Sequence, residues 1–193
     1  MICAGINLDK KRAIMPVISV IMAVFNAEDY VAEATESILN QTFTDFEFII
    51  IDDGSTDNTL HIIKDYADQD DRIRVVINEN NVGLAKSLNK GIALAKGKYI
   101  ARMDADDISL LDRFEKQVDF LERNPEIGAL GGSTVHIDQN GNFIRQNQYL
   151  ERPNQIRWAT FFGNNAAHPT VMMRASLFKE AGIQYDENLT TTQ

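Results

Sequence analysis

The first part of the chain alternates continuous apolar runs with segments in which apolar residues recur every three or four positions. The continuous runs are short and rich in β-branched residues, which is typical of strands buried on both faces. They cover 17–25, 46–51, 73–77 and a fourth run that begins at Lys98. The periodic segments cover 28–40, 84–95 and 110–124, and a further one places Leu60, Ile63 and Ala67 on one face. This order predicts a parallel sheet joined by helices, with a ligand crevice at the carboxyl ends of the strands.

Local signals predict where some elements begin and end. Ser55 or Thr56 is expected to cap the second helix, and Gly97 is expected to end the third. Beyond Asn124-Pro125 the alternation breaks down. The later pattern predicts a strand over 127–137 with a flexible Gly131-Gly132, a turn over 138–142 and a strand from 143. It then predicts a helix from 153 to about 162 around Trp158. A strand over 167–173, entered through His168, and a helix over 176–181 are expected to follow.

Three carboxylates follow the fourth apolar run: Asp104, Asp106 and Asp107. Such a cluster is tolerable mainly where cations offset the charge, and at a strand-to-turn transition its members can converge on one hard divalent ion. A solvated acidic turn that caps the next helix is the simpler alternative. An EF-hand beginning at Asp104 is disfavoured, because Ile108 and Ser109 stand where the loop needs a ligand and a glycine.

A second acidic pair, Asp52 and Asp53, ends the second apolar run, so both clusters are expected at one edge of the sheet. A carboxylate there can accept a hydrogen bond from a base N–H or a ribose hydroxyl. Lys86 lies one turn into the following helix, where it could meet a phosphate or simply be solvated. Arg113 and Gln117 could point back at the acidic edge or lie on the surface. His168 could approach a ligand or be satisfied within its loop.

Composition narrows the class of protein. The 193 residues, 44% of them hydrophobic and 24% charged, fit one globular domain with a substantial core. The net charge of −9 argues against a nucleic-acid surface. Cys3 is the only cysteine, which excludes a disulfide framework and a cysteine-based zinc site and favours a reducing cytosol. No apolar stretch is long enough to span a bilayer. Attachment to a membrane surface through other segments stays open.

Taken together, the motifs resemble those of family 2 glycosyltransferases, which are inverting, nucleotide-sugar-dependent enzymes with the GT-A fold. The resemblance rests on 17–26, on 52–57 (Asp-Asp-Gly-Ser-Thr-Asp), on 81–83 with 88–91, on 104–107 with 113–117, and on 168–170 (His-Pro-Thr). It covers nearly the whole chain from Pro16 onward. It implies an α/β fold of Rossmann-like type, with a mostly parallel central sheet flanked by helices.

The resemblance also implies roles for individual residues. Val24 and Asn26 become a wall of the nucleotide site, and Asp53, together with Asp52, becomes the contact for uracil or ribose. Asp104 and Asp106 form the D-x-D motif that holds Mn²⁺ or Mg²⁺ against the diphosphate. The expected donor is a UDP-sugar and the expected acceptor is a saccharide or a lipid-linked molecule. A cytoplasmic protein, at the inner face of the cell membrane or free of it, is expected.

The sequence departs from the family pattern in three places. Ala23 and Leu111 stand where many members have proline. Members also continue past a segment like 182–187 into an acidic motif that supplies the catalytic base, so the base is expected beyond Gln193. The expected organisation is a leader over 1–14, a nucleotide-sugar-binding half over 15–108, and an incomplete acceptor-side half over 109–193.

Three other functions were weighed. A sugar nucleotidyltransferase would need a glycine- and arginine-rich loop after the first strand, where 26–29 is Asn-Ala-Glu-Asp. A phosphatase with an aspartate nucleophile would need its D-x-D at the end of that strand. A nucleotide-binding module with a degenerate site is the non-enzyme alternative, and donor hydrolysis or sugar transfer would exclude it.

Overall fold

The computed structural model describes residues 15–150, 156 and 166–188, and it contains a six-stranded sheet in the order β3-β2-β1-β4-β8-β5. Its strands are β1 (Ile18–Val24), β2 (Phe46–Asp52), β3 (Ile73–Ile77), β4 (Tyr99–Met103), β5 (Ala129–Leu130) and β8 (Met172–Arg174). Strands β1 to β4 are parallel, as predicted, whereas β8 runs antiparallel to both β4 and β5. The predicted leader and the predicted helix around Trp158 lie outside the described residues.

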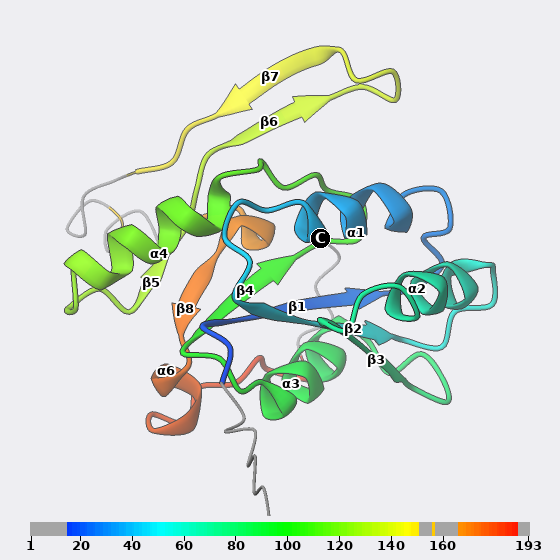
Figure 1. The fold of residues 1–193 in the computed structure, drawn as a ribbon, viewed down its shortest axis with the longest axis horizontal. Helices are drawn as coiled ribbons and strands as arrows, with labels where there is room; N and C mark the ends of the chain where they lie inside the picture. The colour runs from blue at the N-terminus through cyan, green and yellow to red at the C-terminus, as the bar shows by residue number, and fades with distance from the viewer. Residues whose placement is uncertain (1–14, 151–155, 157–165, 189–193) are drawn as a thin grey trace, which may run out of the picture.

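Helices cover both faces of this sheet (Figure 1). They are α1 (Val31–Leu39), α2 (Thr59–Ala67), α3 (Leu84–Leu94), α4 (Arg113–Arg123) and α6 (Ser176–Lys179). One face packs against α1, α2 and α4, and the other against α3 and α6. Among the described residues, no helix combines the length and the apolar character needed to cross a membrane.

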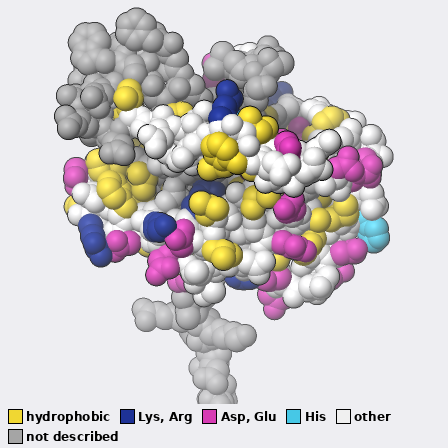
Figure 2. Space-filling view, turned by 90° about the horizontal axis from the view of Figure 1, so that it is seen from above, with side chains coloured by type: hydrophobic (Ala, Val, Ile, Leu, Met, Phe, Trp, Pro, Cys, Tyr) yellow, Lys and Arg dark blue, Asp and Glu magenta, His cyan; other side chains and the backbone are white. Residues whose placement is uncertain are grey.

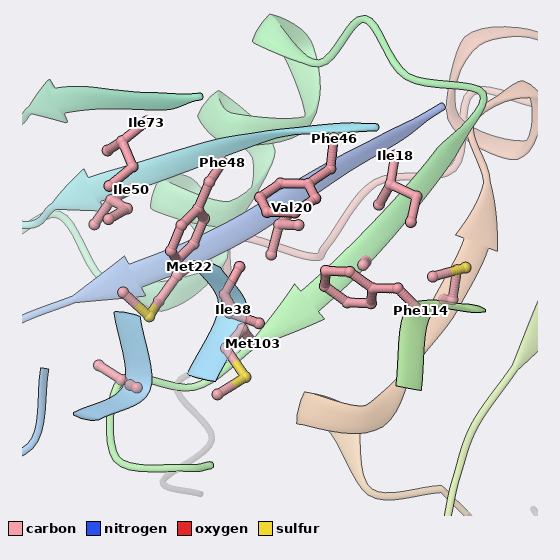
Figure 3. Close-up of a cluster of buried hydrophobic side chains, with 14 of the residues drawn as sticks. Ile18, Val20, Met22, Ile38, Phe46, Phe48, Ile50, Ile73, Met103 and Phe114 are labelled. Carbon is pink, nitrogen blue, oxygen red and sulfur yellow. The ribbon is translucent and has the colours of Figure 1, made fainter. Parts of the chain in front are cut away.

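The larger hydrophobic core lies between the sheet and the helices α1, α2 and α4 (Figure 3). Phe46, Phe48 and Phe114 are at most 4% exposed there, and the rings of Phe46 and Phe114 meet edge to face at 5.8 Å. On the opposite face α3 lies close to the sheet, because a Cβ at Gly91 would come within 2.6 Å of the Ile21 side chain. The central strands are therefore buried on both faces, as the continuous apolar runs predicted.

The prediction of one strand over 127–137 is wrong, because this stretch contains two strands that belong to different sheets. Residues 129 and 130 form β5 in the main sheet, and β6 (Thr134–Ile137) pairs with β7 (Phe143–Asn147) in a separate hairpin. Gly132 lies between them, and its N–H and C=O both bond the hydroxyl of Thr170. At the point where the chain leaves the main sheet, the backbone of Gly132 thus bonds a side chain and not a neighbouring strand.

The hairpin of β6 and β7 confirms the predicted turn over 138–142. Asp138 orders this turn by accepting hydrogen bonds from the backbone N–H groups of Asn140 and Asn142. The hairpin stands apart from the main sheet (Figure 1), and Figure 2 shows hydrophobic side chains exposed on the face that carries it.

Two predictions about local structure need correction. The strand predicted over 167–173 is a short 3-10 helix, His168–Thr170, followed by β8. Gly97 does not end α3, since the C-cap is Ala95 and Gly97 carries no positive φ. Gly97 is needed for another reason: a Cβ there would come within 2.5 Å of the Ser19 backbone nitrogen.

Candidate functional site

The carboxyl ends of three neighbouring strands bring the two acidic clusters to one edge of the sheet. Strand β1 lies between β2 and β4, and Val24 at its end is in register with Asp52. Asp53 follows β2 directly and Asp104 follows β4 directly. The clusters therefore flank the end of β1, as the β-α-β topology predicted.

The loops after β1 and β2 are tied together by side chains. Asn26, in the left-handed region at φ 49°, donates its N–H to Ser55 Oγ at 3.0 Å and accepts the Thr56 N–H on its Oδ1 at 2.8 Å. The prediction that Ser55 or Thr56 caps α2 is wrong, because α2 begins after Asn58. Both hydroxyl residues instead bond Asn26, which holds the loop after β1 against the loop after β2.

Asp53 is the centre of a buried hydrogen-bond cluster. Its carboxylate accepts hydrogen bonds from Asn78 Nδ2 at 2.7 Å, from the Val82 N–H at 3.0 Å and from the Gly83 N–H at 2.9 Å. Burial alone would raise the pKa of Asp53, but these hydrogen bonds outweigh it and lower the pKa below its ordinary value. Asp53 thus anchors the turn that precedes α3.

The same turn depends on Gly54. This residue has φ +76°, and a Cβ on it would lie 2.7 Å from the backbone carbon of Asn80 and 2.8 Å from the nitrogen of Asn81. Asn78 completes the cluster, since its Oδ1 accepts a hydrogen bond from Lys90 Nζ at 2.6 Å. The loop after β2 and the turn after β3 therefore pack backbone to backbone.

Asp52 differs from Asp53 in its partners. It is 1% exposed, and its Oδ2 accepts a hydrogen bond from the Ser55 N–H at 3.3 Å. Its Oδ1 is buried and has no hydrogen-bond partner in the part of the chain that the structure describes. A buried acceptor without a donor is costly, so the Asp52 carboxylate is less well satisfied than that of Asp53.

The second cluster brings three carboxylates together. One oxygen from each of Asp104, Asp106 and Asp107 lies within 4.8 Å of the other two. Burial raises the pKa of Asp104, and Arg102 only partly offsets this effect. Burial also raises the pKa of Asp107, to which the neighbouring carboxylates add. Converging carboxylate oxygens of this kind are the ligands that Mg²⁺ and Mn²⁺ prefer.

Arg102 was not singled out as a site residue from the sequence. Its side chain is only 2% exposed, and its Nη1 forms an ion pair with Oδ1 of Asp104. A signal was present, because an arginine inside a strand otherwise buried on both faces is rare without a paired charge.

Arg113 faces the acidic edge, whereas Gln117 is buried beside Arg113 and accepts a hydrogen bond from its Nε at 3.1 Å. Arg113 Nη2 donates to the backbone oxygen of Arg102 at 2.8 Å, and Gln117 Nε2 donates to the backbone oxygen of Thr170 at 2.8 Å. Burial and the nearby Arg102 lower the pKa of Arg113 to about 10. Arg113 therefore stays protonated at neutral pH and adds a second positive charge beside the acidic triplet, Asp104, Asp106 and Asp107.

His168 and Tyr185 bring the C-terminal segment of the described chain to this region. His168 Nε2 and the Tyr185 hydroxyl lie 2.7 Å apart, and Asn89 on α3 bonds the backbone N–H and C=O of Tyr185. Burial, reinforced by Arg102, lowers the pKa of His168 to about 4, so the imidazole is neutral at pH 7. Tyr185 was not predicted as a site residue, because it carries no motif of its own.

The other predicted site residues occupy different environments. Val24 is 2% exposed and lines the core as well as the edge, whereas Lys86 is exposed on the first turn of α3. No described contact ties Lys86 to either acidic cluster. The structure thus brings Asn26, Asp52 and Asp53 into one group and Asp104 and Asp106 into the other.

Residues 19–182 match the sequence model of the family described as "Glycosyl transferase family 2". An uncharacterised glycosyltransferase of Methanocaldococcus jannaschii is 39% identical over 183 residues, which are 92% of this chain and 62% of that protein. The O-antigen biosynthesis glycosyltransferase WbnJ of Escherichia coli is 38% identical over 172 residues, which are 88% and 66% of the two chains. The chain thus spans about three-fifths of the length of these relatives.

Solved structures with a similar fold include residues 1–349 of S. aureus TarS in complex with UDP, with a TM-score of 0.72 and 25% identity over 91% of this chain and 52% of that chain. The same TarS fragment was also solved with UDP-GlcNAc. The mannosyltransferase PcManGT of Pyrobaculum calidifontis, in complex with GDP-Man and Mn²⁺, has a TM-score of 0.68 and 18% identity over 92% and 49% of the chains. These likenesses confirm the predicted α/β fold of GT-A type.

Proposed function

Because the chain belongs to glycosyltransferase family 2, we propose that it binds a UDP-sugar at the carboxyl edge of its sheet and passes the sugar to an acceptor hydroxyl with inversion. The observation that carries the proposal is the placement of two acidic clusters on either side of the end of β1. The pair Asp52 and Asp53 suits the nucleoside, and the cluster that begins at Asp104 suits a divalent cation beside the diphosphate. The TarS complexes with UDP and UDP-GlcNAc support the choice of donor.

The acidic triplet fits a divalent cation. Asp104 and Asp106 are the proposed ligands, and Asp107 has an oxygen close enough to join them. A bound Mn²⁺ or Mg²⁺ supplies electrostatic stabilisation of the charge that develops on the departing diphosphate. The side chains contribute hard oxygen ligands within one short turn, so the cation and the diphosphate can share that edge.

The nucleoside is proposed to lie between the ends of β1 and β2. Val24 and Asn26 form one wall, and Lys86 at the start of α3 approaches a phosphate. Asp52 has an unpartnered oxygen, whereas both oxygens of Asp53 already accept hydrogen bonds within the protein. Asp53, together with Asp52, is the proposed contact for the base or ribose, and Asp53 also supports the pocket wall through its hydrogen bonds within the protein.

The reaction proposed is a single displacement. An acceptor hydroxyl attacks the anomeric carbon from the face opposite the diphosphate, and the bond to the diphosphate oxygen breaks. A carboxylate within hydrogen-bond reach has to take the acceptor's proton. The expectation that this base lies beyond Gln193 stays a prediction. His168 is a poor candidate, because burial lowers its pKa to about 4 and makes the imidazole a weak base, and its Nε2 is engaged with Tyr185.

The broader setting is also proposed from the relatives. WbnJ is described as an O-antigen biosynthesis enzyme, which supports a role in the synthesis of a polysaccharide or glycoconjugate on a saccharide or lipid-linked acceptor. Residues 15–108 would form the nucleotide-sugar half, and the segment from 109 onward would form part of the acceptor side. A location in the cytoplasm, either at the inner face of the membrane or free of it, is proposed on the same ground.

Calorimetric titration of the chain with UDP, with and without Mn²⁺, tests the proposal. We expect tighter binding with Mn²⁺, because the acidic edge otherwise repels the diphosphate. Asp106→Asn should remove most of this metal dependence. Asp119→Asn is the matched control, since Asp119 is an exposed carboxylate on α4 paired with Arg123 and lies outside the triplet.

Equal UDP affinity with and without Mn²⁺ would contradict the assignment of the metal site. A metal effect of the same size in Asp106→Asn would do so as well. Incubation with UDP-GlcNAc and Mn²⁺ extends the test to chemistry, because release of UDP separates an enzyme from a nucleotide-binding module.

A further inference from the structure

Arg102 is a buried cation with few partners. It lies in β4, a strand whose five residues are all buried, and its side chain is 2% exposed. A guanidinium group carries five N–H donors. In the part of the chain that the structure describes, only the Asp104 carboxylate meets it, in an ion pair between Nη1 and Oδ1, and none of Nε, Nη1 and Nη2 makes a hydrogen bond of ordinary geometry. The group therefore forms an ion pair but leaves most of its donors unused.

Such an arrangement is poor for stability. A buried charge with unsatisfied donors costs more than an apolar side chain of similar volume, and β4 is otherwise filled by apolar residues and tyrosine. The cost falls at a position two residues before Asp104, beside the proposed cation site. A functional role therefore explains the buried charge at this position better than a structural role does.

The position of Arg102 affects Asp104 in two ways. The contact with Nη1 engages one carboxylate oxygen of Asp104 from the buried side, so a bound cation finds the other oxygen. The positive charge also offsets part of the negative charge of the triplet, to which the half-buried Arg113 contributes as well. Both effects weaken the attraction of the empty triplet for a cation.

We propose that Arg102 is a positioning residue of the divalent-cation site, which limits Asp104 to one ligand oxygen and lowers the affinity of the site for cations. This inference rests on the proposed function, since it assumes that the triplet holds the metal. Two consequences follow from the chemistry of the ions. Cation binding to the protein without nucleotide should be weak, and Ca²⁺ should be disfavoured, because it prefers bidentate carboxylates and more oxygen ligands than Mg²⁺ or Mn²⁺.

Replacing the charge tests the proposal. Arg102→Met keeps a long apolar stem and removes the charge, whereas Arg102→Lys keeps the charge. Binding of Mn²⁺ and Ca²⁺ is measured by titration calorimetry without nucleotide, and Mn²⁺ binding is repeated with UDP present. Circular dichroism verifies folding, and Arg102→Gln replaces the methionine variant if that variant does not fold.

In Arg102→Met we expect Mn²⁺ to bind about tenfold more tightly than in the wild type, from the loss of one nearby charge. Ca²⁺ should gain more than Mn²⁺, because Asp104 can then offer both oxygens. Arg102→Lys should stay within about threefold of the wild type. Lys116→Met is the control for loss of an exposed charge on α4, where Lys116 pairs with Asp112, and should bind both ions as the wild type does.

Unchanged or weaker Mn²⁺ binding by a folded Arg102→Met protein would overturn the proposal. A lysine variant that shifts as far as the methionine variant would also overturn it, because charge would not be the cause. Failure of the wild type to bind either ion without nucleotide, and to bind Mn²⁺ with UDP present, would instead remove the metal site on which the proposed function rests. The first two results appear in the variants and the third in the wild type, so the two failures are distinguishable.

Discussion

Replacing Asp53 with alanine should destabilise the fold as well as weaken nucleotide binding. The carboxylate accepts three hydrogen bonds, from Asn78, Val82 and Gly83, and is 4% exposed. Hydrogen bonds to a charged acceptor contribute roughly 1.5–3 kcal/mol each. Water can reach the exposed Val82 in the variant, and Asn78 keeps its bond to Ser87, so the expected loss is about 3 kcal/mol in total.

Denaturation by guanidinium chloride, followed by circular dichroism, measures this loss. Asp106→Ala is the matched control, because it removes an exposed carboxylate from the same edge of the sheet and should change the free energy of unfolding by less than about 0.5 kcal/mol. Asp53→Asn should resemble the alanine variant, since its amide N–H groups face donors rather than acceptors. Affinity for UDP should fall with and without Mn²⁺, because the turn before α3 loses its anchor.

The effect of Asp53 should depend on pH in a defined direction. Its folded-state pKa is lower than its ordinary value, so the stabilisation is complete above about pH 4 and is lost as the pH falls through the folded-state pKa. The wild type and Asp53→Ala should therefore converge in stability in acid. Two results would refute the reasoning: a loss below about 0.5 kcal/mol at pH 7, or a difference that does not shrink in acid.

Three further predictions concern stability and protonation. Gly54→Ala should lower the free energy of unfolding by about 2 kcal/mol or more, because Gly54 has positive φ and approaches the next turn closely. Gly141→Ala should lower it by about 1 kcal/mol, since Gly141 has positive φ but open space around it. Equal melting temperatures for the two variants would contradict this. Arg174→Met should cost about 3 kcal/mol, because its guanidinium donates to three backbone carbonyl oxygens, and chemical denaturation measures it. His168 should stay neutral well below pH 6.5 in an NMR titration. Because the unfolded chain then binds a proton that the folded protein does not, wild-type stability should fall between pH 6.5 and about 4 more steeply than that of His168→Gln. A normal imidazole pKa in the folded protein would exclude this.

The parallel part of the fold could be predicted from the sequence because its signals are local. A continuous apolar run such as 46–51 has to be buried on both faces, and a helical spacing such as that of 84–95 supplies the covering layer. The topology of β-α-β units then predicts that Asp53 and Asp104 lie at the same edge. The parallel α/β sheet and the shared acidic edge follow from these short-range patterns, whereas the D-x-D role of Asp104 and Asp106 and the GT-A fold were predicted from the family resemblance.

The sequence by itself determined the four parallel strands, the helices between them and the edge at which the acidic residues meet. The tertiary structure decided the partners: Asp53 supports the turn before α3, Asn26 binds Ser55 and Thr56, and β8 pairs antiparallel with β4, so that Ala101 lies opposite Met172. It also decided that Arg102 faces inward against Asp104. The physical reason is that hydrophobic periodicity constrains each segment on its own, whereas a hydrogen bond or an ion pair depends on which distant segment supplies the other atom.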